Sequence, residues 1–231
     1  MARRSVADGV RIVACTPHIL QGVYANAGPD IRQRVEQLQA ELNAAHIDCR
    51  LVCGSDAHVS PDLVDGLQAR RILSLNDSRY VLVEPPHHIL PPNMDRFFFD
   101  LLAAGYVPIL THPERMFWAD ANYGLLRHLV RSDAWMQLTA GSIVGRFRGE
   151  AKSRSERMLR DGMVHVVASD APSAAAPVPP DKLDNPAENA EPFFRHMSSY
   201  FHAQLSRRGK ALIPRIRRSK CSQGAAPSER A

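Results

Sequence analysis

The segment Gly105-Tyr-Val-Pro-Ile-Leu-Thr-His-Pro-Glu-Arg115 shows the pattern that decides the fold. Its apolar run, Val107–Thr111, is typical of a short strand that is buried on both faces. Directly behind that run stand His112, Glu114 and Arg115. In parallel α/β folds, functional side chains gather at the carboxyl ends of the strands, so this segment predicts both a buried strand and a site at its end.

Similar units lie on both sides of this segment. Further apolar runs predict strands, and helical segments with apolar residues at helical spacing or a terminal glycine lie between them. Such repeating units predict an α/β fold with a parallel sheet covered by helices, either an open doubly wound sheet or a (β/α) barrel. The further runs are Val10–Cys15, Cys49–Cys53, Tyr80–Val83, Ala134–Thr139 and Val164–Ser169, and the helices are expected after Asp30 and Ser60 and over Met94–Ala104, Tyr123–Val130 and Gly149–Arg160.

The composition predicts one sizeable domain with a basic tail. A chain of 231 residues can bury a core. The net charge of +5 comes from seven basic residues between Arg207 and Lys220, where no acidic residue occurs. We expect a domain over residues 1–185, a terminal helix over 186–206 and a disordered tail over 207–231. The tail could bind nucleic acid, but a solvated end is the simpler interpretation.

The chain carries no recognisable targeting segment. No apolar run reaches the roughly 18 residues of a membrane span, and the first residues lack the apolar stretch of a secretory signal. We therefore expect a cytoplasmic protein. The four cysteines form no C-x-x-C pair, and none precedes an arginine by six positions, so cysteine-based phosphatase chemistry has no support.

Polar residues follow the predicted strands and are candidates for a metal site. In a barrel all these strand ends lie on one face, where imidazole and carboxylate groups would suit Mn, Fe, Zn or Mg. Metals bridged by a carboxylate would activate water, and Arg115 could hold a phosphate dianion. His58, His87 and His88 are left open as further ligands. The candidate ligands are His18, Asp56, Glu84, His112 and Asp170.

At these positions the sequence resembles the CpsB/CapC-type protein-tyrosine phosphatases of the PHP (polymerase and histidinol phosphatase) superfamily. The resemblance runs from about Asp8 to Asp170. The motifs, in order, are Thr16-Pro-His18, Gly22-Val-Tyr-Ala-Asn26, Gly54-Ser-Asp56, Leu75-Asn-Asp-Ser-Arg-Tyr80 with Glu84, Gly105–Arg115, Gln137-Leu-Thr-Ala-Gly-Ser142 and His165-Val-Val-Ala-Ser-Asp170.

The resemblance implies a distorted (β/α) barrel that holds up to three metal ions, usually manganese. It implies hydrolysis of phosphotyrosine, typically on a tyrosine kinase that controls capsule or exopolysaccharide export. By position, His18, Asp56, Glu84, His112 and Asp170 match the family's metal ligands. Arg115 matches its phosphate-binding arginine.

Three departures from the family pattern predict an impaired site. The family opens with a strand that carries Asp-x-His-x-His, whereas this sequence starts beyond that point, near Asp8. We therefore expect an N-terminally truncated chain with an incomplete barrel. Pro172 and Val178 stand where the family has a histidine and an arginine. Fewer bound ions and weaker activity would follow.

Two other functions remain open at this point. One is a non-catalytic remnant that binds the partner kinase. The other is a PHP phosphatase that acts on a small phosphomonoester such as histidinol phosphate. The stretches Leu75–Tyr80 and Gln137–Ser142 favour the capsule type.

Overall fold

A computed structural model describes residues 2–20, 22–147 and 149–169 of the chain. Asp170 and the expected terminal helix (186–206) and basic tail (207–231) lie outside these residues. Among the described residues, no helix has both the length and the apolar composition that a membrane span needs.

The predicted alternation of strands and helices is confirmed. The strands are β1 (Ile12–Cys15), β2 (His18–Ile19), β3 (Arg50–Cys53), β4 (Asp56–His58), β5 (Tyr80–Glu84), β6 (Val107–Thr111), β7 (Trp135–Thr139) and β8 (Val166–Ala168). The helices are α1 (Ala2–Ala7), α2 (Gly28–Ala44), α3 (Leu63–Gln68), α4 (Met94–Ala103), α5 (Tyr123–Arg131), α6 (Ala140–Ile143) and α7 (Gly149–Arg160), with 3-10 turns η1 (Leu75–Asp77) and η2 (Pro113–Arg115).

The strands pair in parallel and in the order in which they occur along the chain. β1 pairs with β3, and β2, β4, β5, β6, β7 and β8 follow one another in the larger sheet. The same two chain segments stay paired between these ladders, because the Gly54 amide donates to the Cys15 carbonyl at 3.0 Å and the Asp56 amide donates to the Pro17 carbonyl at 3.1 Å. β1–β2 and β3–β4 are thus two long strands, each bent in the middle.

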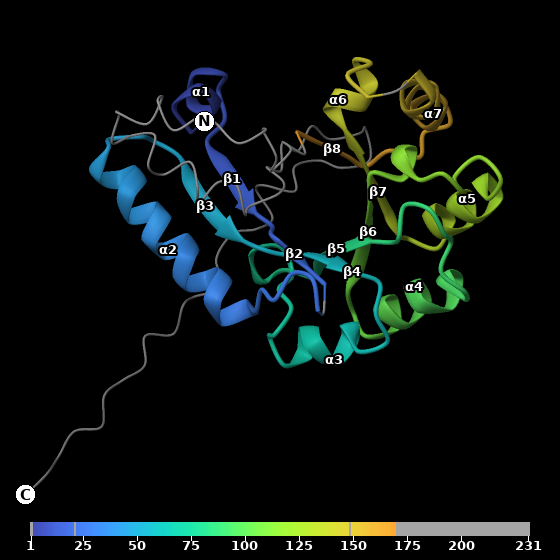
Figure 1. The fold of residues 1–231 in the computed structure, drawn as a ribbon, viewed down its shortest axis with the longest axis horizontal. Helices are drawn as coiled ribbons and strands as arrows, with labels where there is room; N and C mark the ends of the chain where they lie inside the picture. The colour runs from blue at the N-terminus through green and yellow to red at the C-terminus, as the bar shows by residue number, and fades with distance from the viewer. Residues whose placement is uncertain (1, 21, 148, 170–231) are drawn as a thin grey trace, which may run out of the picture.

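This strand order favours one of the two architectures that the sequence left open. A doubly wound sheet reverses its order at a switch point, whereas a barrel adds each strand beside the previous one. The described strands show no reversal, which is the winding of the expected PHP-type barrel. They form an arc with α2, α3, α4 and α5 around its outside (Figure 1). Within the described residues, β1 and β8 are the outer strands of this arc.

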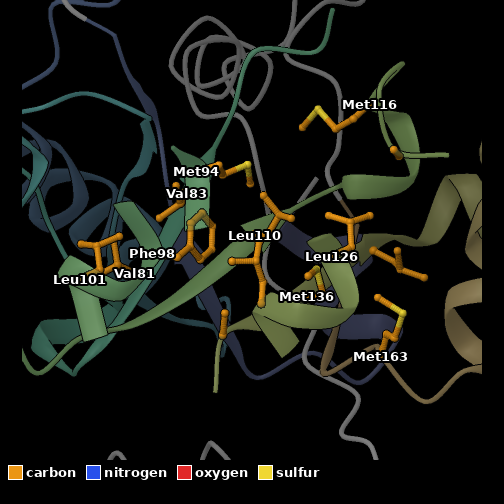
Figure 2. Close-up of a cluster of buried hydrophobic side chains, with 14 of the residues drawn as sticks. Val81, Val83, Met94, Phe98, Leu101, Leu110, Met116, Leu126, Met136 and Met163 are labelled. Carbon is orange, nitrogen blue, oxygen red and sulfur yellow. The ribbon is translucent and has the colours of Figure 1, made fainter. Parts of the chain in front are cut away.

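The main core fills the space between the strands and the surrounding helices. α4 contributes Met94, Phe98 and Leu101, which recur at helical spacing and are at most 2% exposed. They pack with side chains such as Val83 and Leu110 from the buried strands (Figure 2). The apolar runs that predicted strands therefore form the core that holds the strand ends in place.

Besides the short helices α1 and α6, two strands and two helix starts differ from the sequence-based expectation. β2 and β4 were not predicted, because they are short and carry His18 and Asp56 in place of apolar side chains. α3 begins after Ser60, at Leu63. α2 begins at Gly28, ahead of Asp30, because the Gly28 amide donates to the Arg71 carbonyl at 2.8 Å. A tertiary contact therefore fixes that start.

The cysteines of the described region are free thiols, as expected. Cys15 and Cys49 are buried and Cys53 is partly buried. Burial raises the pKa of all three thiols, so they remain protonated and behave as small apolar side chains.

Candidate metal centre

The carboxylate of Glu84 is the centre of a cluster of histidines at the carboxyl end of β5. One of its oxygens, Oε2, lies 3.0 Å from His18 Nδ1 and 2.8 Å from His58 Nε2. The other, Oε1, lies 3.2 Å from His87 Nε2 and 3.2 Å from His112 Nε2. Each carboxylate oxygen therefore faces two imidazole nitrogens.

Strand register brings the first half of this cluster together. His18 on β2 lies beside Asp56 on β4, and His58 on β4 lies beside Glu84 on β5. The Asp56 carboxylate lies 3.9 Å from His18 Nδ1 and is almost fully buried. Because side chains alternate along a strand, Asp56 and His58 point to the same face. The parallel ladder thus aligns these groups without help from any loop.

His87 comes from a loop that two hydrogen bonds tie to the segment after β6. The Phe117 amide donates to the His87 carbonyl at 2.9 Å. The Trp118 indole N–H donates to the Pro86 carbonyl at 2.9 Å. These bonds hold the His87 ring 5.0 Å from the His112 ring, on the Oε1 side of Glu84.

His112 adopts a strained backbone conformation at the end of β6. Its φ of 35° and ψ of 51° lie in the left-handed region, which typically costs a non-glycine residue about 1–3 kcal/mol. Strain of this kind often occurs at functional sites. Here the conformation turns the chain into η2 and leaves the His112 side chain only 3% exposed beside Glu84.

Arg154 of α7 fastens the η2 segment that follows His112. Its guanidinium donates to Asp120 at 2.7 Å and to the Met116 carbonyl at 3.2 Å. The Glu114 side chain is fully buried in the same segment and accepts a hydrogen bond from the Thr139 amide at 3.0 Å. The backbone that carries His112 and Arg115 is therefore held from two neighbouring elements.

Electrostatics keep Glu84 ionised. Burial alone would favour the neutral acid, but hydrogen bonds from the four histidines outweigh it and hold the pKa of the Glu84 carboxyl well below its usual range. The carboxylate is thus available as an anion at neutral pH, surrounded by nitrogen donors.

The donor set fits divalent cations. Two groups of three donors share Glu84, one with His18 and His58 and the other with His87 and His112, and within each group the donor atoms lie within 4.8 Å of one another. Imidazole nitrogen combined with carboxylate oxygen suits Mn, Fe or Zn better than Ca. A carboxylate that contributes one oxygen to each group is the arrangement that adjacent metal ions share.

Four of the predicted ligands, His18, Asp56, Glu84 and His112, are brought together. The structure adds His58 and His87, which the sequence left open. A signal for His58 was present, since Asp56-x-His58 has the spacing of one strand face. His87 carries no such signal, because its position depends on the loop contacts described above.

Three sequence-predicted positions lie elsewhere or outside the description. Asp170 is not among the described residues. His88 stacks on Phe117, with ring centroids 4.7 Å apart. Arg115 lies in η2, three residues after His112, and its guanidinium sits 4.8 Å above the Phe147 ring.

Comparison with known proteins connects this centre to a family. Tyrosine-protein phosphatase YwqE of Bacillus subtilis is 37% identical over 171 residues, which cover 74% of this chain and 67% of YwqE. A putative tyrosine-protein phosphatase, CapC of Staphylococcus aureus, is 28% identical over 173 residues, which cover 75% of this chain and 68% of CapC.

A solved structure gives the same assignment. It is described as one of the crystal structures of YwqE from Bacillus subtilis and CpsB from Streptococcus pneumoniae, unique metal-dependent tyrosine phosphatases. It matches with a TM-score of 0.71 and 31% identity, over 89% of this chain and 90% of that chain. The family model for capsular polysaccharide synthesis, CpsB/CapC, matches residues 1–187. The expected resemblance is confirmed, and the chain belongs to the CpsB/CapC family of capsular polysaccharide synthesis proteins.

Proposed function

We propose that this chain is a metal-dependent phosphatase that removes phosphate from tyrosine residues of proteins. The observation that carries the proposal is the position of Glu84, whose two oxygens each face two imidazole nitrogens. The names of YwqE and CapC and the family description support the reaction and its place in capsule synthesis.

The residues of the centre take distinct roles in this proposal. His18, His58 and Asp56 would hold one cation together with Glu84, and His87 and His112 would hold another with the same carboxylate. Asp170, which follows β8 by two residues, is proposed as a further ligand. Manganese is the proposed metal. Divalent ions at such a site supply a nucleophilic water at neutral pH and neutralise charge on the phosphoryl oxygens.

Arg115 is proposed to bind the phosphate dianion. Its guanidinium is a planar fork that matches two phosphate oxygens. Stacking on Phe147 limits the rotamers of the Arg115 side chain, so less entropy is lost when phosphate binds. Because Arg115 follows His112 within the short turn η2, the proposed phosphate-binding residue and a proposed metal ligand lie on one rigid segment.

The proposed protein substrate is a tyrosine kinase of polysaccharide export, and the proposed location is the cytoplasm. Support comes from the family description, since capsule synthesis is the process that the family model names.

A phosphate-release assay tests the proposal. The chain is stripped with a chelator and assayed on a phosphotyrosine peptide with Mn²⁺, Fe²⁺, Zn²⁺ or Mg²⁺ added separately. We expect turnover that depends on added metal, is highest with Mn²⁺ and is lost in Arg115→Ala. Elemental analysis separates the non-catalytic alternative, because a binding remnant need not retain metal. Absence of both bound metal and turnover would contradict the proposal.

A further inference from the structure

Aromatic side chains surround the metal centre without belonging to it. Tyr24 contacts His18, Phe117 contacts His88 next to His87, and Phe147 contacts Arg115, the proposed phosphate-binding residue. All three lie in segments that follow the carboxyl ends of strands, on the side of the sheet where the donors gather. Such exposed aromatic groups around a polar centre indicate a binding surface rather than a core.

Phe117 has the firmest connection to the centre. Its amide donates to the carbonyl of His87 at 2.9 Å, so its backbone is tied to a proposed ligand. Its ring stacks on His88 with centroids 4.7 Å apart and planes 16° apart. Yet 53% of the Phe117 surface remains exposed. The ring is therefore held in one orientation while much of it stays open to a ligand.

Tyr24 and Phe147 occupy comparable positions next to other parts of the site. The Tyr24 ring lies 5.5 Å from the His18 ring, and 47% of this tyrosine is exposed. Phe147 is partly buried and lies beneath the Arg115 guanidinium, at 4.8 Å. Proposed ligand and phosphate-binding residues are thus bordered by apolar rings.

We propose that Phe117, with Tyr24, forms an aryl-binding rim that receives the phenyl ring of the substrate and makes the site selective for aryl phosphomonoesters. The inference rests on the proposed phosphatase function and names the residues that select its substrate. A phosphoryl group held at the metal centre would bring its ester substituent to the strand ends, where the Phe117 and Tyr24 rings are exposed. A flat phenyl group can stack on Phe117, whereas a short alkyl chain such as that of phosphoserine is too small to cover it.

Equilibrium binding tests the rim better than reaction rates do, because phenolate is a better leaving group than an alkoxide. The probes are benzylphosphonate and methylphosphonate, which share the phosphonate group and cannot be hydrolysed. Calorimetric titration of the Mn²⁺-loaded chain should give a dissociation constant about tenfold lower for benzylphosphonate, the size expected for partial burial of one ring.

Phe117→Ala should bring the two dissociation constants within about twofold of each other while leaving that of methylphosphonate unchanged. Phe117→Tyr, which keeps a ring, should retain the preference. Phe99→Ala is the matched control, since Phe99 is 58% exposed but lies on α4, outside the rim. It should behave as wild type.

The possible results distinguish failure of the aryl-binding rim from failure of the proposed phosphatase function. Loss of the aryl preference in Phe117→Ala alone supports the rim. An unchanged preference in Phe117→Ala, or a wild-type chain that hydrolyses phosphotyrosine but binds both phosphonates equally, overturns the rim and leaves the phosphatase intact. A wild-type chain that binds neither phosphonate and releases no phosphate overturns both.

Discussion

Replacing Glu84 by glutamine tests how much of the centre depends on one carboxylate. Glutamine has nearly the same shape, but it carries no charge and has one oxygen in place of two. In the structure, each oxygen contacts two histidine nitrogens at 2.8–3.2 Å. One of the two donor groups must therefore face an amide NH₂, which cannot ligate a cation.

The expected loss follows from the number of ligands removed. Loss of a residue that only orients a ligand typically costs about 10–100-fold in metal affinity. Glu84 is a direct donor in both groups and, among the described residues, the one anion proposed beside His87 and His112, so we expect a loss of at least about 100-fold for the weaker ion, or about 2.7 kcal/mol. Phosphotyrosine turnover should fall at least in proportion.

The assay is calorimetric titration of Mn²⁺ into chelator-stripped protein. Glu41→Gln is the matched control, since Glu41 is an exposed glutamate on α2, and it should bind metal as wild type does. If Glu84→Gln bound the same number of ions with unchanged affinity, Glu84 would not be a shared ligand and the reasoning would be refuted.

Three further predictions concern stability and are checked by urea unfolding. Phe98→Ala should lower the free energy of unfolding by about 3–5 kcal/mol, because this ring is 1% exposed in the main core; a loss below about 1 kcal/mol would show that the core repacks. Gly28→Ala should destabilise the fold by about 1–3 kcal/mol, since the new Cβ would lie 2.1 Å from a backbone oxygen. Gly124→Ala should stabilise the fold by about 0.5 kcal/mol, because the new Cβ meets nothing within 4 Å and alanine favours the helix. Equal effects at the two glycines would contradict this. A hydrogen bond from Arg32 outweighs partial burial and lowers the pKa of the Asp77 carboxyl. This ion pair therefore stabilises the fold fully at pH values above the unfolded pKa of about 4. The stabilisation is lost as the pH falls through the lower pKa that Asp77 has in the folded state. Asp77→Asn should thus cost about 0.5–1 kcal/mol at pH 7 and less at pH 2, and a cost that is constant with pH would exclude the ion pair as its cause.

The sequence predicts the scaffold well because buried parallel strands are apolar on both faces. β5, β6 and β7 appear as runs whose bounds nearly match the structure. β2 and β4 are not predicted from the sequence, for the opposite reason. They carry His18, Asp56 and His58, so the strands that build the site lack the apolar signal that reveals a strand.

The residues of the candidate site also divide into those that the sequence predicts and those that it does not. Glu84 and His112 are predictable because each comes directly after a strongly apolar run. His87 is not, since its place beside Glu84 depends on hydrogen bonds from Phe117 and Trp118, which are distant in sequence. The strained backbone of His112 is likewise a tertiary property, since local preferences disfavour it.

The central claim is that the two oxygens of Glu84 are shared between adjacent cations. Anomalous diffraction at the manganese edge, on crystals grown with Mn²⁺, tests it most directly. We expect one peak on each side of the Glu84 carboxylate, the first beside His18 and His58 and the second beside His87 and His112. A single ion remote from Glu84, or no peak in the histidine cluster at saturating Mn²⁺, would contradict it.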